Sequence, residues 1–478
     1  MRRYKLMERI PTYVPHLDGI LNGGLPRNST LLISGVPGSG KTILVSQIVY
    51  GNATPQDKAL VITTVSEPMA RLIRFAQGFS FFDLDKVGTA VVYEDIGPML
   101  LKGNGEKGLD RVAELVLKHQ PSLLVVDSFK AIHDVSESEA ELRRALYRLA
   151  ATLATMPCTT LLVGEYGADE MVTVPEMAIV DGIIELSNRP VGLRDYRCLR
   201  VRKLRGSDYL SGKHTFRITS DGITIFPRFV TPPAPAVYTA SRERVPTGIA
   251  GLDELLHGGL LRGTTALVAG DPGAGKTVTS LHFLLNGARR GEPGTHISFQ
   301  EDPNQLAQIA RNFGFDVETL QEQGLVDMFY TSPVELDVDE HMLQIVEVVE
   351  RVGARRVVID SIGDFEAGAR WDGDRFFNYV YSLVQWFKNR GITALLTYEV
   401  GQMFGSGLTL TGRGVSHIAD NVILIRYVPA ESEIRRAITV LSARGSSHSN
   451  EVREYLITEE TGPRVGGPIS GAFSVLET

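Results

Sequence analysis

Two glycine-rich segments of the sequence have the residue types and the spacing needed to hold the phosphates of a nucleotide. Residues 35–42 read GVPGSGKT and residues 270–277 read GDPGAGKT, so both fit the pattern G-x-x-x-x-G-K-[ST]. The glycines let backbone N–H groups surround phosphate oxygens, and the start of the following helix adds a partial positive charge. The residues expected to contact the nucleotide are Gly35, Pro37, Gly38, Ser39, Gly40, Lys41 and Thr42 in the first segment, and Gly270, Pro272, Gly273, Ala274, Gly275, Lys276 and Thr277 in the second.

The lysine and the threonine of each segment have different expected roles. Lys41 and Lys276 are expected to reach the β- and γ-phosphates of a nucleoside triphosphate. The hydroxyls of Thr42 and Thr277 are expected to hold Mg²⁺. The sequence therefore predicts two phosphate-binding loops, each with its own magnesium ion.

Acidic residues farther along the chain could complete each site. Asp127 and Asp360 each end an apolar strand, from which a carboxylate can reach the Mg²⁺ shell; a turn or helix N-cap role is the alternative. Hydrolysis also needs a carboxylate that orients or deprotonates the attacking water. Glu67 and Glu301 follow the second expected strand of each copy and are the candidates, although either could be a plain glutamate at a helix start.

The two loops belong to a large internal repeat. Residues 9–42 match residues 244–277 without a gap, at a constant offset of 235 residues. Residues 231–243 are rich in proline and small polar residues and lack apolar periodicity, which is typical of an exposed linker. We therefore predict two domains, residues 1–230 and 244–478.

Within each copy, short apolar strands alternate with helical patterns. The runs TLLISG and TALVAG lead directly into the two loops, and apolar residues at helical spacing predict a helix over residues 137–156. Strands that alternate with helices predict an α/β fold, a mainly parallel sheet with helices on both faces. Alternating polar and apolar segments near the end of each copy predict antiparallel strands added to that sheet.

The composition limits the class of protein. Of the 478 residues, 43% are hydrophobic and 22% are charged, which is typical of a globular protein with sizeable cores. The net charge of −7 disfavours nucleic acid as a partner, and no apolar stretch is long enough for a membrane helix. We therefore expect a cytoplasmic protein without a nucleic-acid or membrane partner. Cys158 and Cys198 are too few for a disulfide framework and are expected to be buried thiols.

Further motifs give the chain a family resemblance. Each half has a GGL segment before the loop, a DS pair after the strand that carries Asp127 or Asp360, and an RGS segment near its end. With DNVILIRYVPAESEIRRAITVLSARGSSH, these motifs resemble the KaiC family of circadian-clock ATPases over nearly the whole chain. The resemblance implies tandem RecA-like P-loop domains that bind ATP. It also implies that adenine is preferred over guanine, as in the family.

The resemblance also implies a homohexamer of two stacked rings, with ATP at the interfaces between subunits. Lys203 and Arg205 in the first half, and Arg444 in the second, would then reach the γ-phosphate bound by a neighbouring subunit. Without the family resemblance, these lysine and arginine residues would be interpreted as solvated surface residues of strands. Ser442 stands where the family has a second-half lysine, so that site would have one cation fewer.

KaiC proteins phosphorylate themselves in the second ring, on an adjacent serine and threonine. In this sequence Ser416 matches the serine, His417 replaces the threonine, and Thr411 is an upstream alternative acceptor. An ordinary loop serine is the competing interpretation of Ser416. The family's paired glutamates are replaced by Ser66 with Glu67 and by Gln300 with Glu301, so the second glutamate must act or the chemistry is slow.

The leading hypothesis is a KaiC-like ATPase with a candidate serine autokinase activity, acting as a signalling or timing switch. A KaiB-like protein is a candidate partner by resemblance, whereas dependence on a KaiA-type activator is not expected because the sequence stops at Thr478. One alternative is a RecA- or DnaB-like motor on DNA, against which the net charge argues. The other is a nucleotide-gated scaffold with little turnover, which the changes at Ser66 and Gln300 favour.

Overall fold

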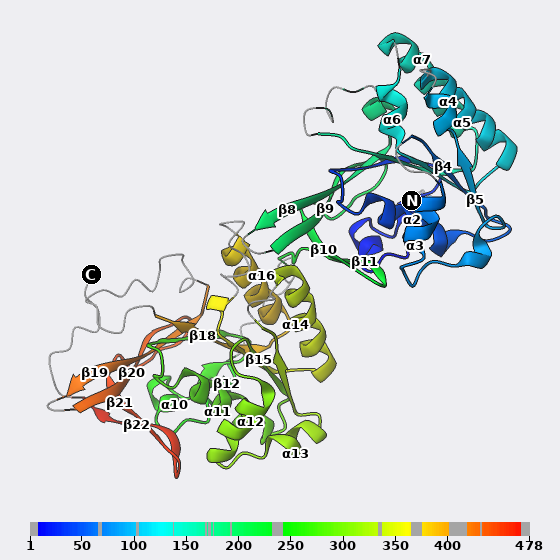
Figure 1. The fold of residues 1–478 in the computed structure, drawn as a ribbon. Coiled ribbons are helices and arrows are strands. Elements are labelled where there is room, and N and C mark those ends of the chain that lie inside the picture. The colour runs from blue at the N-terminus through cyan, green and yellow to red at the C-terminus, as the bar shows by residue number, and fades with distance from the viewer. Residues whose placement is uncertain are drawn as a thin grey trace, which may run out of the picture. The chain divides into compact units, whose positions relative to one another are not determined.

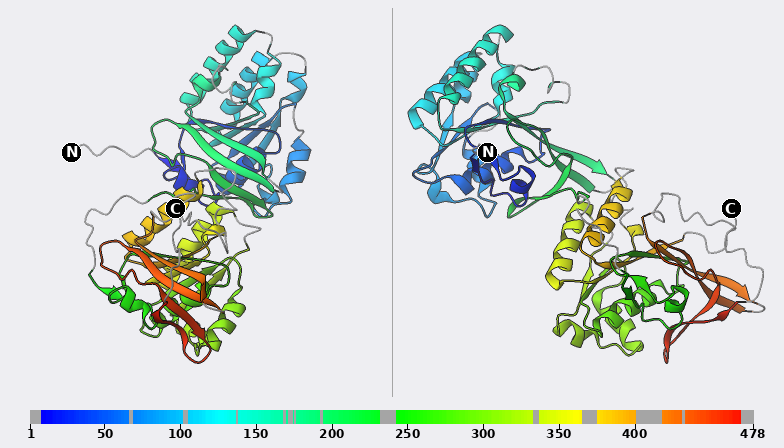
Figure 2. Two further views of the ribbon diagram at one scale, coloured as in Figure 1. Left: turned by 90° about the vertical axis from the view of Figure 1, so that its left-hand side faces the viewer. Right: turned by 180° about the vertical axis from the view of Figure 1, so that it is seen from behind.

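The computed structural model contains two compact units, Met1–Arg228 and Phe229–Thr478. The residues described are 8–65, 69–101, 105–136, 138–167, 170, 174, 176–191, 194–231, 242–332, 337–364, 375–400, 418–430 and 433–469. Figure 1 shows the elements of each unit, and Figure 2 shows them from two further sides.

The first unit is built on a nine-stranded sheet. Its order is β11 (Gly222–Phe226), β10 (His214–Thr219), β9 (Arg194–Leu204), β8 (Gly182–Val191), β3 (Thr30–Gly35), β7 (Thr159–Gly164), β6 (Leu123–Asp127), β4 (Ala59–Thr63) and β5 (Val91–Asp95). The strands from β8 to β5 are parallel to their neighbours in this order, and β9, β10 and β11 are added antiparallel. The expected parallel sheet with antiparallel additions is confirmed.

Helices cover both faces of this sheet because the central strand is apolar on both sides. Leu31 and Ile33 of β3 pack in one core cluster with residues of α2, whereas Leu32 packs in another with residues of α5 and α7. The helices are α1 (Leu17–Ile20), α2 (Lys41–Asn52), α3 (Met69–Ala76), α4 (Gly97–Leu100), α5 (Gly105–His119), α6 (Phe129–Asp134), α7 (Glu139–Ala154) and α9 (Glu176–Ile179), with a 3₁₀ turn at Leu84–Lys86. A strand buried on both faces is typical of parallel sheets.

The second unit repeats this arrangement. Its sheet has the order β16 (Val326–Tyr330), β15 (Gly294–Ser298), β17 (Arg356–Asp360), β18 (Thr393–Glu399), β14 (Thr265–Gly270), β19 (Asn421–Ala430), β20 (Glu433–Ala443), β21 (Arg453–Thr458) and β22 (Gly462–Pro468). The helices are α10 (Leu252–Leu255), α11 (Lys276–Ala288), α12 (Pro303–Asn312), α13 (Val317–Glu322), α14 (Val338–Val352) and α16 (Arg375–Asn389). Both sheets therefore have the same strand order when matched through the repeat, and helices lie on both faces of each (Figures 1 and 2).

The repeated sequence before each loop forms the same small support. In the first unit, β1 (Arg9–Ile10) pairs with β2 (Leu25–Pro26), and the Arg9 guanidinium donates to the carbonyl oxygens of Leu21 and Gly24. In the second, β12 (Arg244–Val245) pairs with β13 (Leu260–Leu261), and Arg244 donates to Leu256 and Gly259. Each GGL segment therefore has a structural role, because the carbonyl oxygen of its second glycine accepts a hydrogen bond from this arginine.

Two smaller expectations can be compared with the structure. Cys158 and Cys198 are both buried thiols, as expected. Within the described part of the chain, no helix is long and apolar enough to span a membrane. Of the predicted linker 231–243, residues 232–241 lie outside the described residues, and the division between the compact units falls between Arg228 and Phe229.

Candidate functional site

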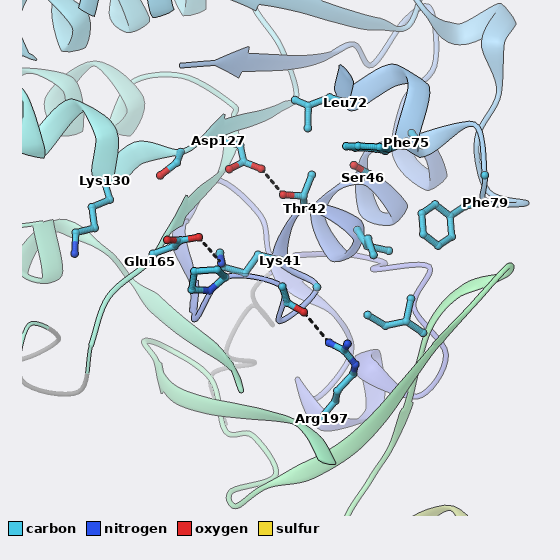
Figure 3. Close-up of a pocket in the computed structure, with 18 of the residues that line it drawn as sticks. Lys41, Thr42, Ser46, Leu72, Phe75, Phe79, Asp127, Lys130, Glu165 and Arg197 are labelled. Carbon is cyan, nitrogen blue, oxygen red and sulfur yellow. Dashed lines mark hydrogen bonds and ion pairs between the residues drawn. The ribbon is translucent and has the colours of Figure 1, made fainter. Parts of the chain in front are cut away.

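A cavity of about 1080 Å³ opens at the carboxyl end of the parallel strands in the first unit (Figure 3). Its polar side is formed by the loop after β3, by Asp127 at the end of β6, and by Glu165 directly after β7. Its apolar side consists of Leu72, Phe75, Ala76, Phe79, Phe81 and Ile218. A site with charged groups on one side and aromatic rings on the other suits a ligand with phosphates and a flat base.

The glycines of each loop are required by backbone conformation and by space. Gly40 precedes α2 with φ of 100°, and Gly275 precedes α11 with φ of 104°, in the left-handed region that favours glycine. A Cβ on Gly40 would lie 3.0 Å from Ile218 Cδ1, and one on Gly275 would lie 2.3 Å from Ile457 Cδ1. Each loop can therefore turn tightly into its helix only with glycine at this position.

Lys41 lies at the centre of the polar side of the cavity. Its Nζ donates to the carbonyl oxygens of Gly35 and Val36, both at 3.0 Å, and lies 3.5 Å from Glu165 Oε1 (Figure 3). Burial lowers the pKa of Lys41, and the charge of Glu165 opposes this shift. The ammonium group is thus held over the loop, where the phosphates are expected.

Lys276 has the same environment in the second unit. Its Nζ donates to the carbonyl oxygens of Gly270 at 3.2 Å and Asp271 at 2.9 Å, and it lies 4.0 Å from Glu399 Oε2. Burial lowers the pKa of Lys276, and Glu399 is the largest opposing influence. The two loops therefore share both the lysine geometry and an acidic neighbour at the end of the adjoining strand.

The threonine and aspartate expected to hold Mg²⁺ meet in the first unit. Thr42 Oγ1 donates to Asp127 Oδ2 at 2.8 Å (Figure 3). In the second unit Asp360 is buried and accepts a hydrogen bond from Thr397 through Oδ1, while Oδ2 has no hydrogen-bond partner among the described residues. A buried carboxylate oxygen without a donor fits a divalent cation, since oxygen ligands are those that Mg²⁺ prefers. These residues therefore fit the expected magnesium ion.

Of the two glutamates that are candidates for the catalytic base, the structure describes only Glu301. Glu67 lies outside the described residues. Glu301 follows β15, and its backbone N–H donates to Ser298 Oγ at 3.2 Å. Burial, and then the charge of Asp360, raises the pKa of Glu301. A carboxyl group with a raised pKa next to the expected metal ligand has the electrostatics of a proton acceptor.

Comparisons with known proteins agree with this arrangement. The family model for the KaiC ATPase matches residues 10–229 and again residues 245–468. The chain belongs to the KaiC family. It is 30% identical over 465 residues to the circadian clock oscillator protein KaiC of Thermostichus vulcanus, covering 95% of this chain and 88% of that protein. It is 29% identical to the proteins of the same name from Picosynechococcus sp. (95% of this chain, 89% of the relative) and from Nostoc sp. (96% and 89%).

The cations that the KaiC resemblance assigns to a neighbouring subunit lie outside the cavity lining. Lys203 donates to the carbonyl oxygens of Val180 at 2.7 Å and Met177 at 3.4 Å within its own unit. Arg205 is exposed and lies 3.9 Å from Asp181, and Arg444 is exposed at the equivalent place after β20. The two arginines are therefore accessible, whereas the Lys203 amine is held by its own chain.

Most of the remaining residues of the KaiC pattern fall outside the described part of the chain. Ser416 and Thr411, the candidate phosphorylation sites, lie outside the described residues, as do Ser66 and His417. Gln300 lies in the turn after β15, next to Glu301.

Sequence reasoning missed several residues that line the site. Glu165 and Glu399 were not singled out, although each stands at the end of an expected strand, which is the signal that would have found them. Arg197 of β9 also lines the cavity, and its Nη1 donates to the Gly38 carbonyl oxygen at 2.8 Å (Figure 3). No motif marks Arg197, because β9 reaches the loop only through the sheet topology.

Proposed function

We propose that the protein is a homohexameric ATPase of the KaiC type, which binds ATP and Mg²⁺ at subunit interfaces in two stacked rings and hydrolyses ATP slowly. One observation carries the proposal: a single cavity brings together Lys41, the Thr42 hydroxyl and the Asp127 carboxylate. The proposed domains are residues 1–230 and 244–478, joined by residues 231–243. The apolar side of the cavity suits a flat base, and adenine is the base that the KaiC resemblance implies.

The chain's own residues would divide the work as follows. The loop N–H groups and Lys41 or Lys276 bind and orient the phosphates, while Thr42 with Asp127, and Thr277 with Asp360, hold Mg²⁺. The metal ion would neutralise charge on the phosphates. Glu67 and Glu301 are proposed to orient the attacking water. Arg205 and Arg444, with Lys203, are proposed to stabilise the γ-phosphate of a neighbouring subunit.

We further propose that the second half phosphorylates Ser416, with Thr411 as the alternative acceptor, so that the protein acts as a signalling or timing switch in the cytoplasm. The names of the curated relatives support a clock role. A KaiB-like protein is the proposed partner.

The test is to incubate the purified protein with ATP and Mg²⁺ and to measure phosphate release and intact mass together. Wild type is compared with Lys41→Ala and Lys276→Ala. We expect Lys41→Ala to remove most turnover. We also expect a mass gain of about 80 Da, one phosphoryl group, that maps to Ser416 and disappears with Lys276→Ala.

The outcomes separate the parts of the proposal. Hydrolysis without a mass gain would retain the ATPase and reject the autokinase. Intact hexamers with neither signal would reject both activities and leave a nucleotide-gated scaffold.

A further inference from the structure

Both units place a glutamate carboxylate beside the loop lysine. Glu165 Oε1 lies 3.5 Å from Lys41 Nζ, and Glu399 Oε2 lies 4.0 Å from Lys276 Nζ. The exposed fractions of the side chains also agree between the units. They are 9% for each lysine, 50% for Glu165 and 51% for Glu399. The same pairing in two units of different sequence indicates a shared role and not a chance contact.

The sheet topology fixes each glutamate at the phosphate end of the site. β7 lies between β3, which leads into the loop, and β6, which ends at Asp127. Glu165 follows directly after β7, and Glu399 is paired in register with Gly270, the first residue of the second loop. The carboxyl end of the middle strand therefore brings a carboxylate next to the loop lysine.

The pairing satisfies an electrostatic need of the site when it holds no phosphate. Each lysine amine is nearly buried, and a buried cation requires a charged or hydrogen-bonding partner. Two backbone carbonyls accept from each amine, and the glutamate supplies the opposing negative charge. The phosphates of a nucleotide held by the loop would supply the same negative charge to the amine.

We propose that Glu165 and Glu399 are counter-ions that the β- and γ-phosphates must displace from the loop lysine, so that each glutamate weakens nucleotide binding and speeds release. This inference rests on the proposed ATP sites. Phosphates and carboxylate carry like charge, so their approach to one ammonium group is competitive. The two glutamates are positioning residues, because they act through the lysine.

The test measures nucleotide affinity in the full chain with one loop disabled. In a Lys276→Ala background, dissociation constants for ATP, ADP and AMP with Mg²⁺ are compared with and without Glu165→Gln. We expect ATP and ADP to bind about three- to tenfold more tightly, since the competing charge is half-exposed and partly screened. AMP binding should not change, because its single phosphate does not reach the lysine.

Matched variants make the result specific. Glu165→Asp keeps the charge and should leave ATP affinity close to that of the parent. Glu114→Gln removes an equal charge from an exposed pair with Arg111 on α5 and should have no effect. The mirror experiment, Glu399→Gln in a Lys41→Ala background, should give a smaller gain because the distance is 4.0 Å.

Two failures are distinguishable. If the Lys276→Ala parent binds no ATP, the proposed site in the first unit is rejected, and the counter-ion role with it. If the parent binds ATP but Glu165→Gln leaves the affinity unchanged or weakens it, the counter-ion role alone is rejected. A fall in phosphate release at unchanged affinity would also overturn it, because the carboxylate would then act on the reacting water.

Discussion

At the scale of single residues, the acidic groups around the loops decide what each site can do. Thr42 Oγ1 and Asp127 Oδ2 already lie 2.8 Å apart, so the two oxygens proposed to hold Mg²⁺ are adjacent in the first unit. Asp127→Asn replaces one of these oxygens with an amide donor. We predict that ATP affinity then no longer improves on addition of Mg²⁺, and that phosphate release falls about a hundredfold or more.

This prediction is measured in the Lys276→Ala background, with ATP binding compared between Mg²⁺ and a chelator. Asp110→Asn is the control, because it removes the same charge from an exposed ion pair with Arg148. A Mg²⁺ effect that survives Asp127→Asn would contradict the role of this carboxylate.

The raised pKa of Glu301 predicts that ATP hydrolysis by the second half depends on pH. Burial, reinforced by Asp360, raises its pKa, so it remains protonated to a higher pH than an ordinary glutamate. A base must be ionised, so hydrolysis by the second half should fall as the pH decreases through this raised pKa. The measurement is phosphate release against pH in a Lys41→Ala chain, where Glu301→Gln should lower the plateau and abolish the acid limb.

The same shift predicts a change in stability of known sign. A carboxyl group with a raised pKa in the folded state adds stability below its unfolded pKa, and this contribution is lost as the pH rises through the folded value. Glu301→Gln should therefore raise the urea midpoint of the second unit more at pH 7 than at pH 4. If the change in urea midpoint caused by Glu301→Gln were the same at both pH values, Glu301 would not be in a buried environment.

Much of the candidate site could be predicted from residue patterns, because a phosphate loop is a local motif. Lys41 and Thr42 lie where the pattern places them, and Asp127 joins them because it ends a parallel strand. Glu165 and Arg197 reach the loop through strand order alone. A local pattern carries no information about which strands are neighbours, so these contacts required the structure.

At the scale of elements, periodicity predicted the type of each element better than its ends. The helix predicted over residues 137–156 is α7, Glu139–Ala154, because Ser138 caps its start by accepting a hydrogen bond from the Glu141 N–H. The antiparallel strands after the core were also predicted. The insertion of β7 between β3 and β6 was not, since hydrophobic pattern does not specify order within a sheet.

One buried ion pair distinguishes corresponding strands of the two units. Arg356, at the start of β17, is 1% exposed and donates to Glu292 at 2.6 Å and to the carbonyl oxygens of Pro246 and Phe283. The equivalent first residue of β6 is Leu123, which is also buried. The second unit therefore links β17 to the turn before β15 with charge, whereas Leu123 packs within an apolar core cluster of the first unit.

This difference predicts unequal effects of two substitutions. Glu292→Gln leaves the Arg356 charge buried without its partner and should lower the free energy of unfolding of the second unit by about 3–5 kcal/mol. Arg356→Leu, which installs the residue type of the first unit, should lower it less. Urea unfolding is monitored by hydrogen exchange, which reports the stability of each unit separately. Glu350→Gln, in an exposed pair with Arg390, is the control and should cost under about 1 kcal/mol.

At the scale of the whole molecule, the two units share one architecture but differ in some of the charged residues expected at their sites. Both sheets have the same strand order, and both loops have the same lysine geometry. The strands that lead into the RGS segments differ in charge. Ser442 of the second unit stands where the first unit has Lys203, whereas both units have the following arginine, Arg205 or Arg444. Two similar folds with different cations would give two rings of different rate in the proposed hexamer.

The proposed interfaces predict complementation between two inactive subunits. Arg205 is exposed, and within its own unit its charged group lies 3.9 Å from Asp181, outside the cavity lining. Arg205→Ala should therefore lower phosphate release by tenfold or more without weakening ATP binding. In hexamers reassembled from equal amounts of Arg205→Ala and Lys41→Ala chains, about one interface in four joins an intact loop to an intact arginine, which should restore about a quarter of the wild-type rate. Phosphate release is measured before and after mixing, with the separate samples as controls, and a mixture no faster than their mean would place the action of Arg205 within its own subunit.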